Sequence, residues 1–560
     1  MKYNILIGGS AGQGMSTISF LLQKILKRKG FYIFSNKDYM SRVRGGHNFI
    51  QIRFGDEPIT SYNPNLDVII ALDQNTINFH KDRLNDNGII ICDDEINTEE
   101  SKKNIINIPM KDIAKEVGNR KVFGSAALGA IIKSFNLSMD KVESVFNDRF
   151  SEKVAHDNLE AFKKGYGTIN SSFNINEDST DDSILINGNQ AIGLGAIAGG
   201  VNFYSAYPMT PATSIMTFLA KNQQEAGIMV EQAEDEIAAI NMAIGASYAG
   251  IRAMTGSSGG GFSLMVETLG LVAITEIPLV VVNVQRPGPA TGLPTRTAQS
   301  DLNFMLSSSQ DEFPRMVIAV RNPEDAFYQT VRALNIADKY QMLVILLNDQ
   351  YLADYNQTIK AFDMDKVSID RHLSNDNILE DNKYKRYKLT ESGISPRIVP
   401  GRFKKQTVLA DSHEHNEYGF VEESSENRIN MMKKRMNKME LLKEELKEPE
   451  YYGDDNPDIL LLGWGSMDGA LKEVTKMFKN KGINIGALVF GDIYPLPTEE
   501  LIKYSNMAEK IINVEQNYTG QLARLIKSET NIKCTNSILK YDGRQLNSYE
   551  IYNKLKSEVL

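Results

Sequence analysis

Short apolar runs rich in β-branched residues alternate with helix-like segments in three stretches of the chain, residues 1–168, 184–355 and 456–560. In the first stretch the runs NILIGG, LDVIIALD and GIIICDD alternate with patterns such as MSTISFLLQKILKRKG. Strands that alternate with helices predict parallel sheets covered by helices on both faces. We therefore expect an α/β fold with three doubly wound parallel-sheet domains, which agrees with a length of 560 residues at roughly 150 residues per domain.

Two segments interrupt this alternation. Residues 169–183 are polar and lack a periodic pattern, which predicts a linker. Residues 356–455 are charged and rich in Asn, and we interpret them as a crossover segment rather than a compact core. Within this segment, residues 426–448 read ENRINMMKKRMNKMELLKEELKE, which predicts an exposed helix whose lysine side chains lie in solvent.

The composition excludes several classes of protein. The formal net charge of −9 provides no polybasic surface for nucleic acid, and no apolar run reaches the ~18 residues that a membrane span needs. The start of the chain, MKYNILIGG, lacks the pattern of a signal peptide. Cys92 and Cys534 are too few for a disulfide framework, a four-thiolate zinc site or an iron–sulfur cluster. We expect a reduced, cytoplasmic protein that holds no metal itself and binds neither nucleic acid nor a membrane.

Residues 8–17, GGSAGQGMST, are similar to a phosphate-binding P-loop that lacks its lysine. The pattern is G-x-x-x-x-G-M-S, with Met15 in the place of the lysine, which argues against a nucleotide triphosphatase. Two interpretations stay open. The glycines either form a turn that lets helix 15–29 pack on its strand, or Gly12 and Gly14 belong to a neutral nest of backbone N–H groups that binds an anion.

Residues 41–48, SRVRGGHN, place Arg42, Arg44 and His47 beside a pair of glycines. Guanidinium groups bind anionic groups through paired hydrogen bonds. The segment is therefore a candidate for an anion site or for a contact with a partner subunit, with a solvated loop as the alternative.

The stretch AYPMTPATS, residues 206–214, predicts a rigid turn because Pro208 and Pro211 flank Thr210. Its spacing alone indicates a proline-stiffened connection between a strand and a helix. Function enters only through a resemblance that is given below.

Acidic residues precede a run of small side chains in VEQAEDEIAAINMAIGASYAG, residues 230–250. The small residues predict a buried helix that other backbones approach closely. Glu231, Glu234 and Asp235 are explained by the preference of carboxylates for the first turn of a helix. Glu236 is explained least well, because it lies next to the buried run, where a carboxylate needs a partner.

A buried strand ends near Arg286 in VVVNVQRPGPATGLPTRTAQSDL, residues 280–302. Open α/β sheets bind ligands beyond the carboxyl ends of their strands, and a loop rich in Gly and Pro follows the strand here. The guanidinium fork of Arg286 suits a carboxylate ligand. An ion pair with Asp301 is the structural alternative.

Together these motifs resemble the α subunit of the 2-oxoacid:ferredoxin oxidoreductases with the γ subunit fused in front, and among them the 2-oxoglutarate type. GGSAGQG and RGGHN are similar to the γ module, whereas NGNQAIGLGAIAGG, YPMTP, EDEIAAINMAIGASYAG and QRPGPATGLPTRTAQSD are similar to the α subunit. The resemblance implies that residues 1–168 are a γ-type domain, residues 184–355 the pyrimidine-binding domain for thiamine diphosphate, and residues 456–560 a domain like the C-terminal domain of transketolase.

The resemblance also implies which residues meet the coenzyme. One carboxylic acid shares a proton with the aminopyrimidine ring of thiamine diphosphate, and aligning the small-residue helix places this catalytic role on Glu236, with Glu231 and Glu234 as alternatives. Tyr207, Pro208 and Met209 of YPMTP would contact the same coenzyme.

Four residues are implied to bind the substrate. Thr210 and Arg286 would bind the carboxylate of a 2-oxoacid. Thr295 and Arg296 would bind its far end, and Arg296 would meet a second carboxylate if the substrate is 2-oxoglutarate.

The resemblance further implies partners that the chain needs. Thiamine enzymes hold the diphosphate through Mg²⁺ on a G-D-G…N motif, which this sequence lacks. A β subunit would therefore bring the diphosphate pocket, Mg²⁺ and a [4Fe–4S] cluster, with the coenzyme at the interface between the subunits. CoA would enter near the γ module, where Gly12, Gly14, Arg42 and Arg44 would meet its phosphates or contact a subunit.

The predicted reaction is the oxidative decarboxylation of a 2-oxoacid with CoA and oxidised ferredoxin to acyl-CoA, CO₂ and reduced ferredoxin. 2-Oxoglutarate is favoured on family grounds, with pyruvate or a branched-chain 2-oxoacid as alternatives. Two rival functions are a carboligase that uses thiamine without oxidation and a non-catalytic scaffold. The carboligase would normally carry its own diphosphate motif.

Overall fold

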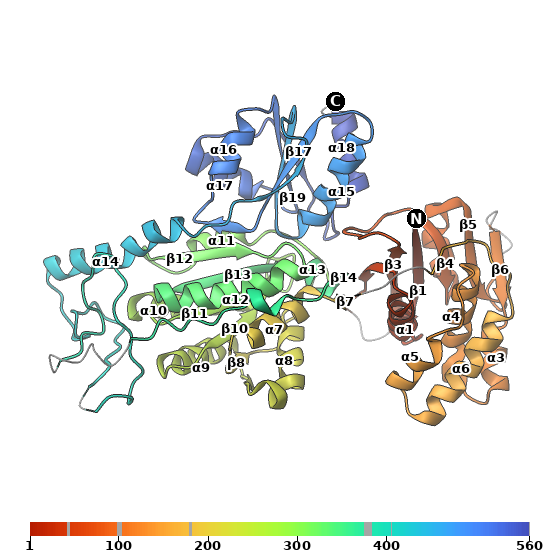
Figure 1. Ribbon diagram of the computed structural model, residues 1–560, viewed down its shortest axis with the longest axis horizontal. Helices are drawn as coiled ribbons and strands as arrows, with labels where there is room; N and C mark the ends of the chain where they lie inside the picture. Colours follow the sequence, from red (N-terminus) through yellow and green to blue (C-terminus); the bar gives the residue numbers. More distant parts are fainter. Residues whose placement is uncertain (42–44, 98–103, 178–181, 375–382, 405, 559–560) are drawn as a thin grey trace. The chain divides into compact units, whose positions relative to one another are not determined.

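The computed structural model describes residues 1–41, 45–97, 104–177, 182–374, 383–404 and 406–558 (Figure 1). The chain divides into two compact units. The first comprises Met1–Ile186, Asp354–Ala361 and Asn547–Tyr549, and the second comprises Asn187–Ala353, Phe362–Leu546 and Glu550–Leu560. Both units are α/β structures, as the alternation of patterns predicts.

An eight-stranded sheet forms the centre of the first unit. Its strands are β1 (Lys2–Ala11), β2 (Tyr32–Asp38), β3 (Gly45–Gly55), β4 (Leu66–Ala71), β5 (Leu84–Asp93), β6 (Asn104–Ile108), β7 (Ser183–Ile186) and β14 (Asn356–Lys360). They lie in the order β6-β5-β4-β1-β3-β2-β14-β7. β1, β4, β5 and β6 run parallel, whereas β3 is antiparallel to both β1 and β2, so this sheet is mixed rather than parallel throughout.

Helices cover both faces of this sheet. They are α1 (Met15–Arg28), α2 (Gln74–His80), α3 (Met110–Glu116), α4 (Phe123–Ser134), α5 (Val142–Arg149) and α6 (Glu152–Tyr166). Successive residues of a strand point to opposite faces. Accordingly, Ile5 and Ile7 of β1 pack in a core with Leu22 of α1, whereas Leu6 packs in a second core with Ile77 of α2.

Two strands of the first sheet come from segments that were expected to belong elsewhere. β7 lies at the start of the second predicted α/β stretch, and β14 lies in the predicted crossover segment. β14 pairs antiparallel with β7 and with β2. Ile33 N–H donates to Thr358 Oγ1 over 2.8 Å, across a separation of 325 residues. Local periodicity carries no information about pairing over such separations.

A seven-stranded sheet carries the larger part of the second unit, in the order β18-β12-β13-β11-β10-β8-β9. Its strands are β8 (Phe203–Ala206), β9 (Met229–Gln232), β10 (Ala253–Ser257), β11 (Leu279–Gln285), β12 (Arg315–Ala319), β13 (Leu343–Asp349) and β18 (Asp492–Tyr494). All of them run parallel except β18. The carboxyl ends of β8, β10 and β11 therefore lie at one edge of the sheet, where ligands of such folds bind.

The helices of this part are α7 (Gly188–Ala198), α8 (Thr213–Ala226), α9 (Glu236–Tyr248), α10 (Gly259–Thr275), α11 (Leu302–Ser307), α12 (Pro323–Tyr340) and α13 (Gln350–Asp354). α9 and α10 place Ile240 and Met265 in one core with Val281 of β11. None of the helices in the described residues is long and apolar enough to cross a membrane.

The second unit also contains a five-stranded sheet in the order β15-β17-β16-β19-β20. It is built from β15 (Glu450–Gly453), β16 (Ile459–Trp464), β17 (Ile485–Phe490), β19 (Lys510–Glu515) and β20 (Asn536–Leu539), with α15 (Asp468–Lys479), α16 (Glu499–Ser505), α17 (Gln521–Thr530) and α18 (Ser548–Glu558). Only β15 is antiparallel among these strands. Trp464 is buried and donates to Glu515 Oε2 over 3.1 Å, so it is a packing residue.

The helix rich in lysine does not lie wholly in solvent as predicted. In α14 (Ser425–Lys443), Lys434 and Lys438 are fully buried and form ion pairs with Glu276, which is 1% exposed. Burial alone would raise the pKa of Glu276, but the two ammonium groups hold this pKa well below its ordinary value. The prediction is wrong because the compensating carboxylate lies 158 residues away from Lys434 in the sequence.

Candidate functional site

The segment after β8 forms a turn that is bonded to two other parts of the second unit. Thr210 O accepts a hydrogen bond of 2.6 Å from Arg286 Nη1, and Pro211 O accepts one of 2.9 Å from Asn189 Nδ2. Thr213 N–H donates to Met209 O over 3.1 Å as the chain enters α8. The structure thus places Thr210 next to Arg286, the two residues that the family resemblance assigns to a substrate carboxylate.

Glu236 is the one carboxylate of the acidic run that faces inward. It is the first residue of α9 and 4% exposed, and its Oε1 is buried without a hydrogen-bond partner among the described residues. Asp235 caps the helix by accepting from Ala238 N–H over 2.7 Å. Glu231 and Glu234 are exposed. A buried carboxylate oxygen without a partner costs free energy unless a ligand supplies one, so Glu236 is a candidate binding residue.

Three glycines at the N-terminus of α10 bring this carboxylate and the other segments together. A side-chain carbon at Gly261 would lie 2.8 Å from Glu236 Cδ, and one at Gly260 would lie 3.6 Å from Met209 Cε. A side-chain carbon at Gly259 would lie 2.6 Å from Asp301 Oδ2. The absence of side chains at residues 261 and 259 therefore permits the close approach of α9 and the 286–301 loop to a helix N-terminus, where backbone N–H groups lack intrahelical partners. The 207–211 turn lies beside residue 260 at ordinary contact distance.

Arg286 is half-buried and follows the last residue of β11. The alternative ion pair with Asp301 is not formed among the described residues; Asp301 Oδ2 instead accepts from Asn283 Nδ2 over 3.1 Å. Burial lowers the pKa of the Arg286 guanidinium and raises the pKa of Asp301. Because Asp301 does not pair with it, the Arg286 guanidinium can bind a ligand beside Thr210, which is exposed.

Thr295 and Arg296 lie in the loop that follows Arg286. Arg296 N–H donates to Leu293 O over 3.1 Å, and Thr297 N–H donates to Gly543 O over 3.2 Å. Thr295 and Arg296 are both half-buried. The loop is thereby held against the segment that reads YDGR.

Sequence reasoning did not identify a set of buried polar atoms in β8, β10 and β11 and at the start of α10. The hydroxyl groups of Tyr204, Thr255 and Ser258 and the carbonyl oxygen of the Asn283 side chain are buried without a partner among the described residues. Burial raises the pKa of Tyr204 above its ordinary value. The SSGGG sequence after β10 was the available signal, since it predicts an open helix start.

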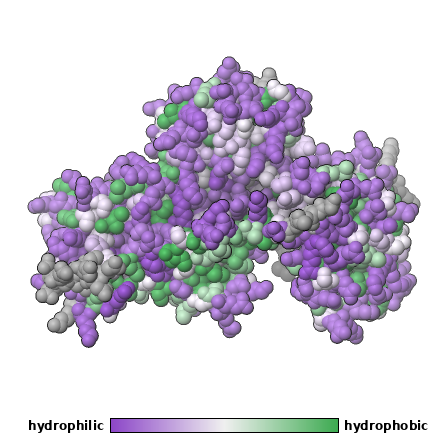
Figure 2. Space-filling model, viewed as in Figure 1, coloured by the Kyte–Doolittle hydropathy of each residue, from purple (hydrophilic) through white to green (hydrophobic). Residues whose placement is uncertain are grey.

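The small-residue helix is buried on one side only, which corrects the expectation of a buried helix. Ile237 and Met242 of α9 are 50% and 42% exposed, and Leu264 of α10 is 51% exposed. Tyr207 and Met229 are exposed as well. Figure 2 shows apolar atoms gathered on the lower part of the second unit, while most of the visible surface is hydrophilic. Large contiguous patches of exposed apolar groups are typical of surfaces that contact other chains.

In the first unit, the lysine-free glycine loop borders a cavity of about 520 Å³. Gly12 and Gly14 line it with positive φ angles of 97° and 79°, and Gly14 begins α1 without a side-chain cap. Lys37 also lines the cavity and forms an ion pair of 2.9 Å with Asp354. Sequence reasoning missed Lys37. Arg42 and Arg44 lie outside the described residues.

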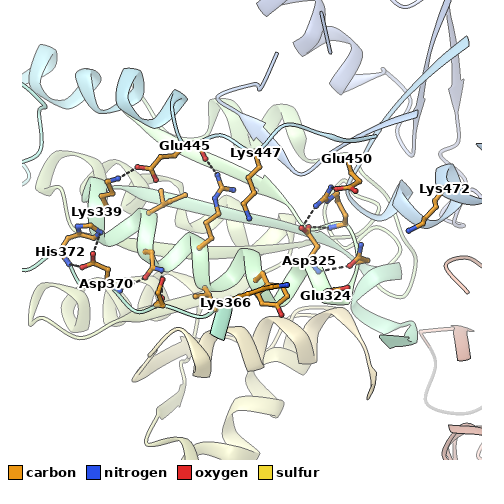
Figure 3. A pocket seen from close by; sticks show the side chains of 18 of the residues that line it. Glu324, Asp325, Lys339, Lys366, Asp370, His372, Glu445, Lys447, Glu450 and Lys472 are labelled. Atoms are coloured by element: carbon orange, nitrogen blue, oxygen red, sulfur yellow. Dashed lines mark hydrogen bonds and ion pairs between the residues drawn. The ribbon is translucent and has the colours of Figure 1, made fainter. Parts of the chain in front are cut away.

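A cavity of about 890 Å³ on the second unit contains none of the predicted site residues (Figure 3). Arg321, just before α12, is paired with Asp325 over 2.8 Å, and Arg332 of α12 is paired with Asp492 over 2.6 Å. Lys339 is paired with Glu445 at one end. These three cations are thus neutralised, and we do not assign the active site to this cavity.

Three family models match successive parts of the chain. The thiamine-diphosphate-binding model of pyruvate flavodoxin/ferredoxin oxidoreductases matches residues 194–434. The model for pyruvate ferredoxin/flavodoxin oxidoreductase matches residues 4–168, and core domain II of pyruvate:ferredoxin oxidoreductase matches residues 457–551.

Relatives cover almost the whole chain. The 2-oxoacid:ferredoxin oxidoreductase subunit alpha of a Sulfolobus species is 33% identical over 97% of this chain and 95% of the relative. The 2-oxoglutarate synthase subunit KorA of Archaeoglobus fulgidus is 31% identical over 61% of this chain and 90% of the relative.

A solved structure has the same fold throughout. It is the 2-oxoglutarate:ferredoxin oxidoreductase from Magnetococcus marinus with 2-oxoglutarate, coenzyme A and succinyl-CoA bound, which is 33% identical and matches with a TM-score of 0.93 over 100% of both chains. The resemblance inferred from YPMTP and the acidic helix is therefore confirmed over the full length. This chain belongs to the 2-oxoacid:ferredoxin oxidoreductases, as an α subunit that includes the family's thiamine-diphosphate-binding region.

Proposed function

We propose that this chain, with a β subunit, oxidises 2-oxoglutarate together with CoA to succinyl-CoA and CO₂ and passes the two electrons to ferredoxin. The observation that carries the proposal is the buried Glu236 Oε1, which has no hydrogen-bond partner among the described residues and lies at the glycine-rich start of α10. The same start of α10 lies beside Met209 of the turn in which Thr210 O accepts from Arg286. The choice of 2-oxoglutarate rests on the substrate named for the Magnetococcus marinus enzyme and on the names of the KorA relatives.

The residues fit thiamine diphosphate. The coenzyme, when bound, supplies the carbon nucleophile that a 2-oxoacid needs in order to lose CO₂. Glu236 Oε1 would hold a proton against a ring nitrogen of the coenzyme, which gives this orphaned oxygen its partner. Tyr207, Pro208 and Met209 would support the ring from the turn, and the glycines of α10 leave the space open.

Arg286 and Thr210 would bind the carboxylate next to the keto group. The guanidinium offers paired donors to a carboxylate, and the Thr210 side chain is exposed beside it. Thr295 and Arg296 would reach the distal carboxylate of 2-oxoglutarate from the same loop. Pyruvate and branched-chain 2-oxoacids lack that second carboxylate and would leave Arg296 without a ligand.

The need for a β subunit follows from two features that the sequence lacks. The sequence contains two cysteines and no G-D-G…N motif, so we propose that the β subunit supplies Mg²⁺ and the [4Fe–4S] cluster. The exposed apolar side chains of α9 and α10 would form part of the contact with that subunit. The cavity beside Gly12, Gly14 and Lys37 would receive the phosphates of CoA.

A reconstituted complex with its β subunit tests the proposal. We expect reduction of a viologen dye with 2-oxoglutarate and CoA, and weaker activity with pyruvate. Glu236→Gln should lower kcat by about 100-fold or more, because it removes an acid–base group. Glu231→Gln, an exposed carboxylate in the same stretch, is the matched control and should retain activity. Equal turnover in both variants would show that Glu236 has no catalytic role.

A further inference from the structure

A chain of buried amide groups joins the 207–211 turn to the loop after Arg286. Asn189 Nδ2 donates to Pro211 O over 2.9 Å, and Asn189 Oδ1 accepts from Asn348 Nδ2 over 2.9 Å. Gln285 Nε2 donates to Asn348 O over 3.2 Å, and Gln285 Oε1 accepts from the N–H of Asp301 over 3.0 Å. The three side chains come from α7, β13 and β11, which lie far apart in the sequence.

Backbone groups fix the direction of every bond in this chain. Pro211 O can only accept, so the Nδ2 group of Asn189 must face it. The Oδ1 group of Asn348 accepts from Asp349 N–H over 2.8 Å, which leaves its Nδ2 group for Asn189. The side chains of Asn189, Asn348 and Gln285 are 0%, 2% and 1% exposed, so water cannot replace a lost bond. These hydrogen bonds between the buried amides therefore have only one possible direction each.

A second connection closes this series of hydrogen-bonded amides into a ring. Arg286 follows Gln285 in the sequence, and its Nη1 donates to Thr210 O over 2.6 Å. Thr210 is in turn bonded covalently to Pro211. The spacing between Thr210 and Arg286 is thus set twice, once by their direct bond and once through the amides.

We infer that Asn189 is a positioning residue for substrate recognition, which holds Thr210 at the distance from Arg286 that a 2-oxoacid carboxylate requires. The inference rests on the proposed function of Thr210 and Arg286. Asn189 touches neither substrate nor coenzyme in this account; it acts through Pro211. A purely structural role would instead lower stability and leave recognition of the 2-oxoacid unchanged.

The test uses the reconstituted complex and two variants at residue 189. Asn189→Leu keeps the shape of the side chain and removes all of its bonds. Asn189→Asp keeps the acceptor for Asn348 and places a carboxylate oxygen against Pro211 O. The matched control is Asn158→Leu in the first unit, because Asn158 is also a buried amide, bonded to Ser125 Oγ over 2.6 Å and to Val154 O over 2.7 Å.

We expect both variants at residue 189 to raise KM for 2-oxoglutarate by about tenfold or more, since small misplacements of binding groups have large effects. The KM for CoA should stay within about twofold. The Kd of 2-oxoglutarate for the thiamine-free complex, measured by equilibrium dialysis, should rise in parallel. The control should change the melting temperature without changing KM. An unchanged KM and Kd in folded Asn189 variants, or the same rise in the control, would overturn the inference.

A second variant covers the case in which Asn189→Leu does not assemble. Gln285→Met interrupts the same chain from the other side and should raise KM and Kd in the same way. The double variant should then add little, because both changes break one connection. A wild-type complex that oxidises no 2-oxoacid would refute the proposed function, whereas an active wild type with unaffected variants would refute only the role of Asn189.

Discussion

At Gly261, the addition of a single methyl group should impair catalysis much more than it lowers the stability of the fold. A side-chain carbon there would lie 2.8 Å from Glu236 Cδ and closer still to Glu236 Oε1 and Ser257 Oγ, whereas ordinary contact begins near 3.4 Å. Glu236 must therefore move by a distance on the order of 1 Å, and such a displacement of a catalytic group costs about 100-fold in rate. We expect Gly261→Ala to lower kcat of the reconstituted complex by about this factor.

Gly260→Ala is the matched control for this prediction. Its side-chain carbon would meet Met209 Cε at 3.6 Å and Ala290 O at 3.8 Å, which are ordinary contacts. Both substitutions replace a helical glycine and gain helix propensity by up to about 1 kcal/mol, while the crowding at residue 261 costs about 1–3 kcal/mol. Steady-state kinetics and thermal denaturation of both variants measure these effects. Wild-type kcat in Gly261→Ala, or equal impairment in Gly260→Ala, would refute the assignment of Glu236.

Three further predictions concern burial, recognition and assembly. Glu276→Gln leaves two buried lysines without their carboxylate and should destabilise the second unit by about 3–5 kcal/mol, seen as a lower melting temperature. Because the pKa of Glu276 is lowered in the folded state, its contribution to stability is complete above the ordinary carboxyl pKa of about 4.3. That contribution is lost as the pH falls through the lowered pKa of the folded state. The difference in stability between wild type and Glu276→Gln should therefore shrink at such low pH. Arg286→Lys should raise KM for the 2-oxoacid by about tenfold or more without loss of stability, because lysine lacks the paired donors; kinetics with unchanged KM would contradict the assignment. Met242→Lys should weaken association with the β subunit by at least about tenfold in analytical ultracentrifugation, while Met364→Lys, also exposed, should not.

Much of the architecture was predictable because its signals are local. Apolar runs bounded by glycine and polar residues identified β1, β4, β5 and β11, since a buried parallel strand needs a nearly continuous apolar run. The same reasoning located Glu236 at the start of a helix and Arg286 at the end of a strand. These positions depend on periodicity over a few residues, which the sequence displays directly.

The sequence by itself determined the α/β class and the family and nominated a short list of candidate site residues, because motifs such as YPMTP and the acidic helix are contiguous. Tertiary structure decided which acidic residue is buried: Glu236 faces the glycines of α10, whereas Glu231 and Glu234 lie in solvent. It also decided that β14 joins the first sheet, that the lysines of α14 are buried on Glu276, and that Asn189 meets Pro211. Each of these outcomes depends on a partner that is distant in the chain, and the free energy of burial is settled only where that partner lies in space.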